Sequence, residues 1–302
     1  MVTTDPRPSP WRKVRLALLL AVLAGVGIKY LLVRRAERWV PDWRATQQVT
    51  LVLLAPASTT AEERDQLERL TRFARLGDDK ATLSALEHWF EVELGRYVAR
   101  PGFRPVQLRV SGAHPYTGAP PPPPRAGEAL AFKDRYRRTR DFLGWYEERL
   151  KDVPGRFPSI VFVTFYGVEA AHVFQGVHSV ADRRSRRGFV FAPLTDQGRD
   201  AALINVAHEL LHLFGATDKY DGDQCVYPEG WVEPFREPRL PQRFAEVMAQ
   251  GIPVAAGRSE ASLDLFEAMR VGVETAREIG WIDQARRDRY YAGDASAGPR
   301  LD

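Results

Sequence analysis

The chain has 302 residues, of which 44% are hydrophobic and 27% are charged, and it carries a net charge of +4. This composition is typical of a globular protein and excludes a disordered chain. The basic residues form neither a long basic helix nor an aromatic-basic pattern, so we expect no nucleic-acid partner. The single cysteine, Cys225, excludes an internal disulfide framework and a cysteine-rich zinc knuckle.

The N-terminal region begins with a short basic leader, residues 1–15, followed by an apolar segment, residues 16–33, whose one charge is Lys29. A helix over this segment is about 27 Å long, close to the roughly 30 Å of a hydrocarbon core. We therefore predict a transmembrane helix or signal anchor that makes the membrane a partner of the chain. The alternative is a signal peptide that is cleaved from a secreted protein.

The predicted topology rests on the basic leader, which favours a cytoplasmic N-terminus. Basic residues also follow the apolar segment, so this indication of topology is weak. We expect a single-pass protein whose larger part lies outside the cytoplasm. Residues 34–48 are predicted to be a juxtamembrane connector, in which Trp39 and Trp43 suit the membrane interface.

The body of the chain, residues 49–290, alternates between strand and helix patterns and is predicted to be one mixed α/β domain followed by a C-terminal tail, residues 291–302. Compact apolar or alternating runs predict strands over residues 49–57, 105–112 and 158–167. Helical periodicity predicts helices over residues 58–76, 82–98 and 129–153. A hairpin with a basic turn is expected over residues 172–193.

Five consecutive prolines, Pro120–Pro124, interrupt this body. Proline donates no backbone hydrogen bond, so the run is predicted to adopt polyproline II conformation. A stiff surface loop is the simpler interpretation, and a ligand for an aromatic groove is the alternative.

A helical pattern over residues 204–215 contains His208, Glu209 and His212. The two histidines are four positions apart, so their imidazoles lie on one face of the helix, about one turn from each other. This spacing allows both to bind one Zn²⁺ at roughly 2.0–2.1 Å. Glu209, next to the first ligand, is placed to act as a general base on a zinc-activated water.

The residues after the second histidine extend the metal-binding pattern. Gly215 stands where a helix can end in a left-handed conformation, and the turn that it permits brings Asp218 back toward the same metal. An aspartate oxygen is an acceptable zinc ligand. We therefore predict a zinc site made of His208, His212 and Asp218.

The pattern H-E-x-x-H-x-x-G-x-x-D over residues 208–218 resembles the zinc signature of the metzincin metalloproteases, most closely the snapalysin-like branch with aspartate as third ligand. The resemblance implies a twisted, mostly parallel sheet with an active-site helix, a methionine turn and a last helix. It also implies that Met248 forms that turn, that residues 188–193 form an edge strand to which a peptide adds, and that residues 262–281 form the last helix.

The sequence departs from the metzincin pattern at several positions. Gln250 stands two residues after Met248, where some metzincins have a tyrosine that assists at the zinc. Tyr220 is an alternative candidate for stabilising the oxyanion, and loop packing is its simpler interpretation. Lys219 matches no familiar subfamily marker, and Cys225 does not fit the pattern of an inhibitory thiolate.

Together these patterns predict a membrane-anchored zinc endopeptidase that acts on a protein or peptide substrate. Zinc on the three ligands polarises the scissile carbonyl, while Glu209 takes the water's proton and passes it to the leaving amine. The alternatives are a zinc-binding protein of the same fold without general protease activity, acting as a binding module, and a hydrolase with a narrow cell-envelope substrate. Glu209 favours an enzyme, because a structural zinc site has no use for that carboxylate.

Overall fold

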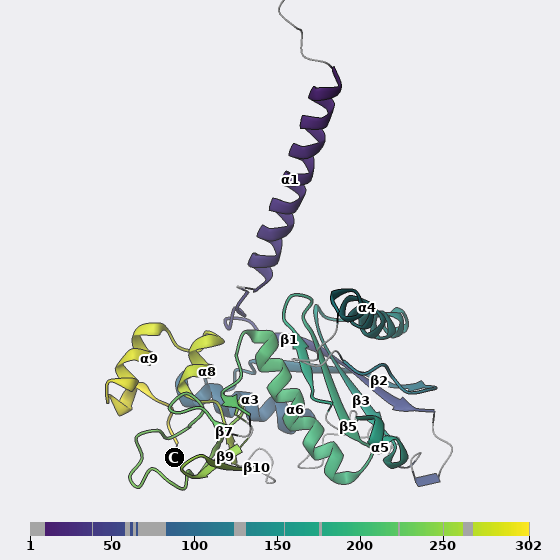
Figure 1. The fold of residues 1–302 in the computed structure, drawn as a ribbon. Helices are drawn as coiled ribbons and strands as arrows, with labels where there is room; N and C mark the ends of the chain where they lie inside the picture. Colours follow the sequence, from purple (N-terminus) through teal and green to yellow (C-terminus); the bar gives the residue numbers. More distant parts are fainter. Residues whose placement is uncertain are drawn as a thin grey trace, which may run out of the picture. The chain divides into compact units, whose positions relative to one another are not determined.

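The computed structural model divides the chain into two compact units, residues 1–39 and 40–302, which we describe separately (Figure 1). The structure describes residues 10–37, 39–57, 61–62, 65, 83–123, 131–153, 155–174, 177–222, 224–249, 251–261 and 268–301. Most of the helix predicted over residues 58–76 lies outside these ranges.

The first unit contains one helix, α1 (Pro10–Glu37), which includes the predicted apolar segment. No helix among the described residues is both long enough and apolar enough to cross a membrane. The transmembrane helix predicted over residues 16–33 is therefore not found among the described residues.

The second unit is built on a five-stranded sheet with the strand order β2-β1-β3-β5-β4. Four neighbouring strands run parallel and β4 is antiparallel to β5. The strands are β1 (Gln47–Pro56), β2 (Val106–Tyr116), β3 (Ser159–Tyr166), β4 (Val180–Asp182) and β5 (Arg187–Pro193). The mixed α/β class and the predicted strands and hairpin are confirmed.

Helices cover both faces of this sheet, which explains why its central strands are continuous apolar runs rather than alternating ones. β3 is buried from Ser159 to Phe165. The helix α4 (Phe132–Arg149) covers one face, and α3 (Leu83–Tyr97) and α6 (Asp196–Phe214) lie on the other (Figure 1). The helices predicted over residues 82–98 and 129–153 are thus confirmed with slightly different ends.

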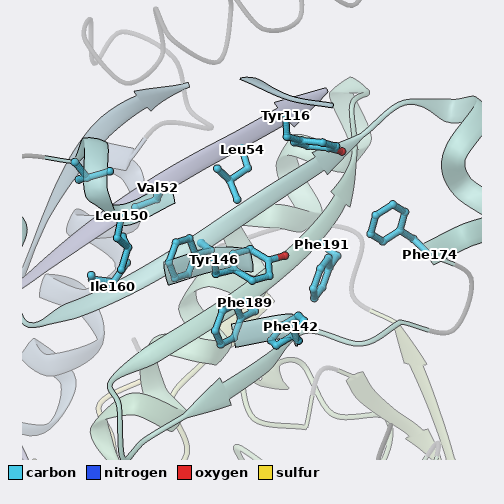
Figure 2. Packing of buried hydrophobic residues seen from close by; sticks show 12 residues of the cluster. Val52, Leu54, Tyr116, Phe142, Tyr146, Leu150, Ile160, Phe174, Phe189 and Phe191 are labelled. Carbon is cyan, nitrogen blue, oxygen red and sulfur yellow. The ribbon is translucent and has the colours of Figure 1, made fainter. Parts of the chain in front are cut away.

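The core under α4 is largely aromatic. Tyr146 lies with its ring centroid 4.8 Å from those of both Phe162 and Phe189, and Phe142 lies 4.7 Å from Phe189 (Figure 2). Burying side chains of this size stabilises a fold by roughly 1.5–3 kcal/mol each. On the opposite face, α6 packs closely on Gly188 of β5: a Cβ at this position would lie 3.4 Å from the Cβ of Glu209 and 3.2 Å from a methyl group of Val161.

The edge of the sheet differs from the prediction. The segment 188–193 was expected to be the edge strand, but it lies between β3 and β4. Val180 pairs with Phe189 and Asp182 with Arg187, so the first arm of the hairpin covers the second. β4, with three residues, is therefore the edge strand on this side of the sheet, and β2 is the edge strand on the other side.

The C-terminal part contains a second, four-stranded sheet with the order β10-β9-β8-β11 and a two-stranded β6-β7 ladder. These strands are β6 (Tyr220–Asp221), β7 (Gln224–Cys225), β8 (Ala245–Glu246), β9 (Gly251–Ala255), β10 (Arg258–Ala261) and β11 (Met269–Arg270). The helices are α8 (Val273–Glu278) and α9 (Gln284–Tyr291). Short segments elsewhere are η1 (Leu150–Asp152), η2 (Val168–Ala170), α5 (Ala171–Phe174) and η3 (Ala295–Ala297).

The single last helix predicted over residues 262–281 is wrong. Residues 262–267 lie outside the described ranges, and Met269 and Arg270 pair with β8 as a parallel strand. Helix α8 begins at Val273, after Gly272. In the described part of this segment, a two-residue strand therefore precedes a short helix.

The compact unit, residues 40–302, includes more of the chain at both ends than the predicted domain of residues 49–290. Trp43 is buried: its Nε1 donates to the carbonyl of Ile279 at 2.6 Å, and its ring lies 5.2 Å from that of Phe214. At the other end, Arg96 donates to the carbonyl of Arg300 at 2.7 Å. Trp43 therefore belongs to the protein core, and residues 34–48 are not wholly a connector.

Candidate metal centre

The helix α6 carries the H-E-x-x-H motif, and each of its ends is fixed by a local feature. Thr195 is the N-cap, with its Oγ1 accepting a hydrogen bond from the Gly198 amide at 3.0 Å. Gly215 ends the helix with φ of +117°, a conformation that side chains strongly disfavour. The chain leaves the helix at this glycine and turns back toward the histidines.

Three potential ligand atoms converge beside the second half of α6. Nε2 of His208 lies 3.0 Å from Nε2 of His212, and Oδ1 of Asp218 lies 3.3 Å and 3.1 Å from these two atoms. Atoms bound at 2.0–2.1 Å to a tetrahedral ion are about 3.3–3.4 Å apart, so these separations fit a Zn²⁺ site. Among the described residues, this is the group of His, Cys, Asp or Glu side chains able to share a metal ion.

Backbone carbonyls fix the tautomer of both imidazoles. Nδ1 of His208 lies 3.0 Å from the carbonyl oxygen of Val247, and Nδ1 of His212 lies 2.9 Å from that of Ala216. A carbonyl only accepts, so each Nδ1 donates its proton to the backbone, and Nε2 is the ring nitrogen left to face Asp218 and a metal. Two imidazole nitrogens and a carboxylate oxygen are ligands that zinc takes in proteins. The donor set therefore fits a divalent metal.

Glu209 is buried beside this group, with a side chain that is 1% exposed. Its Oε2 has no hydrogen-bond partner among the described residues. Burial raises the pKa of Glu209 to about 8, and the charge of Asp218 adds to this shift, while His212 opposes it. A carboxylate that is buried and incompletely bonded is available for proton transfer, and a nearby metal ion favours its ionised form.

Asp218 and Tyr220 lie in the loop that follows the helix. Burial raises the pKa of Asp218, but its hydrogen bonds with His208 and His212 outweigh this effect and hold that pKa well below its usual value. Burial, followed by the charge of Asp218, raises the pKa of Tyr220, whose hydroxyl also bonds to Asp218. The structure thus places Tyr220 beside Asp218, next to the group that could hold a metal.

Met248 lies in a turn next to the histidines and is fully buried. The turn is closed by the Ala249 amide, which donates to the Glu246 carbonyl at 2.9 Å. The preceding residue, Val247, supplies the carbonyl that orients His208. Gln250, which follows the turn, is outside the described residues.

Several residues at the centre were not predicted from the sequence. Val247 acts through its backbone, which no side-chain pattern reveals. Lys219 and Glu246 are buried charged side chains, and Glu278 pairs with Lys219 across 59 positions of sequence. The one sequence signal was Lys219 itself, a charge placed directly beside a predicted ligand.

Other residues considered from the sequence do not join the centre. Cys225 lies with its Sγ 3.1 Å from the Ser259 hydroxyl and outside the ligand group. The remaining histidines are also outside that group: His88, His114, His172 and His178.

A pocket of about 330 Å³ lies where β1, β2 and β3 end. Pro56, Tyr116, Pro120 and Phe174 contribute to its lining, and Glu169 is its one charged lining residue. The polyproline run therefore begins on the protein's own surface, although Pro124 is outside the described residues. None of the ligand-bearing residues lines this pocket, so the metal centre and the pocket are separate.

A scan against models of protein families finds no match to this chain, and a search of curated proteins finds no significant relative.

Proposed function

We propose that this protein is a zinc-dependent endopeptidase. The observation that carries the proposal is the convergence of two imidazole Nε2 atoms and one carboxylate oxygen within 3.0–3.3 Å of each other, beside the buried Glu209. Three protein ligands leave a fourth position open, which is typical of catalytic rather than structural zinc.

The proposed chemistry divides between the metal and the protein. A bound Zn²⁺ supplies a Lewis acid for the scissile carbonyl and lowers the pKa of its water toward 7. His208, His212 and Asp218 would hold the ion. Glu209 accepts the proton of the attacking water and then gives it to the leaving amine.

An extended peptide is the substrate that suits this arrangement. β4 is the edge of the main sheet, and a peptide strand adds to an edge by backbone hydrogen bonds. This replaces the segment 188–193 as the proposed docking strand. β4 itself contacts α6. A peptide that pairs with β4 would therefore lie beside the helix that carries His208 and His212.

The resemblance to metzincins supports the same proposal. The mostly parallel sheet, the motif over residues 208–218 and the turn at Met248 follow one another along the chain in the order that this resemblance implies. We propose a metzincin-like fold on this basis. Tyr220, bonded to Asp218, is proposed to stabilise the oxyanion.

The test measures metal content by mass spectrometry and cleavage of unfolded casein for the wild type, His208→Ala and Glu209→Gln. We expect one zinc per chain in the wild type and in Glu209→Gln, and loss of zinc in His208→Ala. Glu209→Gln should cleave at least 10²-fold more slowly, because the general base is removed. His88→Ala, an exposed histidine outside the ligand group, is the matched control and should retain both properties.

Two other outcomes decide between alternatives. Zinc in the wild type without cleavage of any peptide would favour a zinc-binding module of the same fold. Absence of zinc from the wild type after supplementation with zinc would contradict the proposal altogether.

A further inference from the structure

One ion pair holds the loop that carries Asp218. Nζ of Lys219 lies 2.7 Å from Oε2 of Glu278, on helix α8, and also donates to the carbonyl and hydroxyl oxygens of Thr217 at 2.9 Å and 2.7 Å. The same Glu278 accepts the Thr217 amide at 2.9 Å and its hydroxyl at 2.8 Å. The residues immediately before and after Asp218 are therefore both attached to one carboxylate.

Lys219 is buried and Glu278 is partly buried, so the lysine charge needs bonding partners inside the protein. The side chain of Lys219 is 4% exposed and that of Glu278 is 13% exposed. A buried ammonium group is costly unless every proton is bonded, and Lys219 has three acceptors. Arg277 lies 3.6 Å from Glu278 as a second positive charge, so the carboxylate retains one partner if the lysine is removed.

The backbone of Lys219 joins the same loop to the methionine turn. Its amide donates to the Met248 carbonyl at 3.0 Å, next to the Val247 carbonyl that orients His208. Its own carbonyl accepts from the Val226 amide at 2.8 Å. The loop is thus fixed against α8 by side chains and against the turn by backbone, while the carboxylate of Asp218 is left to face the imidazoles.

We propose that the Lys219–Glu278 pair is a positioning device that holds Asp218 as third metal ligand and thereby sets the metal affinity of the site. The inference rests on the proposed metal site and adds to it two residues that touch neither the metal nor the substrate. Outer partners that orient a ligand typically contribute 10–100-fold to metal affinity.

The test is zinc affinity, measured by competition with a chromophoric chelator on the full chain. Lys219→Met keeps the aliphatic stem and removes the charge, and Glu278→Gln keeps the shape and removes the charge. We expect each variant to bind zinc 10–100-fold more weakly than the wild type. The circular dichroism spectrum of the metal-free protein identifies a variant that has not folded, in which case the other one provides the measurement.

A second measurement shows whether the pair acts through Asp218. If it does, Asp218→Asn combined with Lys219→Met should bind zinc no more weakly than Asp218→Asn alone, because the ligand that the lysine positions is already lost. The visible spectrum of bound Co²⁺ in Lys219→Met should shift toward that of Asp218→Asn. Additive losses in affinity would overturn the proposal.

The control is Arg287→Met, which breaks the 2.8 Å ion pair between Arg287 and Glu274 on the same helix, α8. It should lower stability without changing zinc affinity, since Glu274 makes no contact with the Asp218 loop among the bonds described here. Unchanged affinity in both Lys219→Met and Glu278→Gln, with zinc bound tightly by the wild type, would overturn the positioning role alone. A wild type that binds no zinc would instead contradict the proposed function.

Discussion

Glu246 connects the methionine turn to helix α8 from a fully buried position. Its Oε2 accepts the Met248 amide at 2.5 Å, and its Oε1 accepts the Gly272 amide at 3.1 Å and the Thr275 hydroxyl at 2.7 Å. Burial raises the pKa of Glu246 to about 7, although these bonds and the charge of Lys219 oppose the shift. The protonation of this one residue is therefore coupled to folding.

The pH dependence of stability should report this coupling. The pKa of Glu246 in the folded protein is raised above its unfolded value of 4.5. Its contribution to the free energy of unfolding is therefore fully present below pH 4.5 and is lost as pH rises toward 7. We expect the stability difference between wild type and Glu246→Gln to decrease by up to roughly 3 kcal/mol over this range. Urea unfolding with a chelator present, from pH 4.5 to 7.5, measures it, and parallel profiles for the two proteins would contradict it.

Gly215, at the end of helix α6, allows the turn between β4 and β5 to pack against this helix. A Cβ on Gly215 would lie 2.7 Å from a guanidinium nitrogen of Arg183, in the turn between β4 and β5. The positive side chain thereby reaches the C-terminal end of the helix, where the macrodipole favours it. The end of α6, the hairpin and the start of the Asp218 loop therefore meet at one residue that has no side chain.

Gly215→Ala should destabilise the protein by about 1–2 kcal/mol, because alanine is strained at this φ and would displace Arg183. Its zinc affinity should fall as well, since the loop to Asp218 starts here. Gly144→Ala is the matched control: Gly144 lies within α4 with open space around it, so alanine should stabilise by roughly 0.5–1 kcal/mol. Chemical denaturation of the metal-free proteins measures the change in stability for both variants. The same change in Gly215→Ala and Gly144→Ala would contradict the prediction.

Features that depend on neighbouring residues could be predicted from the sequence, whereas features that depend on distant contacts could not. The order of ligands in α6 and its stop at Gly215 follow from local spacing, and the structure places these residues together. The edge strand was wrong because β4 has only three residues and is recognised by its partner β5 rather than by its own pattern. The last helix was wrong because Met269 pairs with Ala245, a contact that local periodicity does not contain.

In the whole molecule, contacts join parts of the chain that are far apart in the sequence. Trp43, near the start of the second unit, contacts Phe214 at the end of α6 and lies 5.7 Å from Trp281. Because composition and a nearby apolar segment suggested a membrane interface, its role in the core was not predicted. The pair of Lys219 and Glu278 was not predicted for a different reason: 59 positions of sequence separate its members.

A chain that begins at Val40 should fold and bind zinc as the full chain does, because residues 40–302 form one compact unit. Trp43→Ala in this shorter chain should cost about 3–5 kcal/mol, as expected for truncating a buried aromatic residue. Phe132→Ala, at a position that is 86% exposed, is the control and should change stability by less than about 0.5 kcal/mol. Thermal unfolding distinguishes them, and a negligible effect of Trp43→Ala would contradict this view of the core.

The methionine turn also has a consequence for the order in which the protein matures during synthesis. The ribosome completes His208, His212 and Asp218 well before Val247, which orients the first histidine, and before Glu278, which holds the loop. A nascent chain therefore carries all three ligands while it still lacks the residues that aim them. If the protein is the peptidase that we propose, its site reaches full metal affinity only after Val247 and Glu278 have been made, so the growing chain carries a weaker metal site than the finished protein.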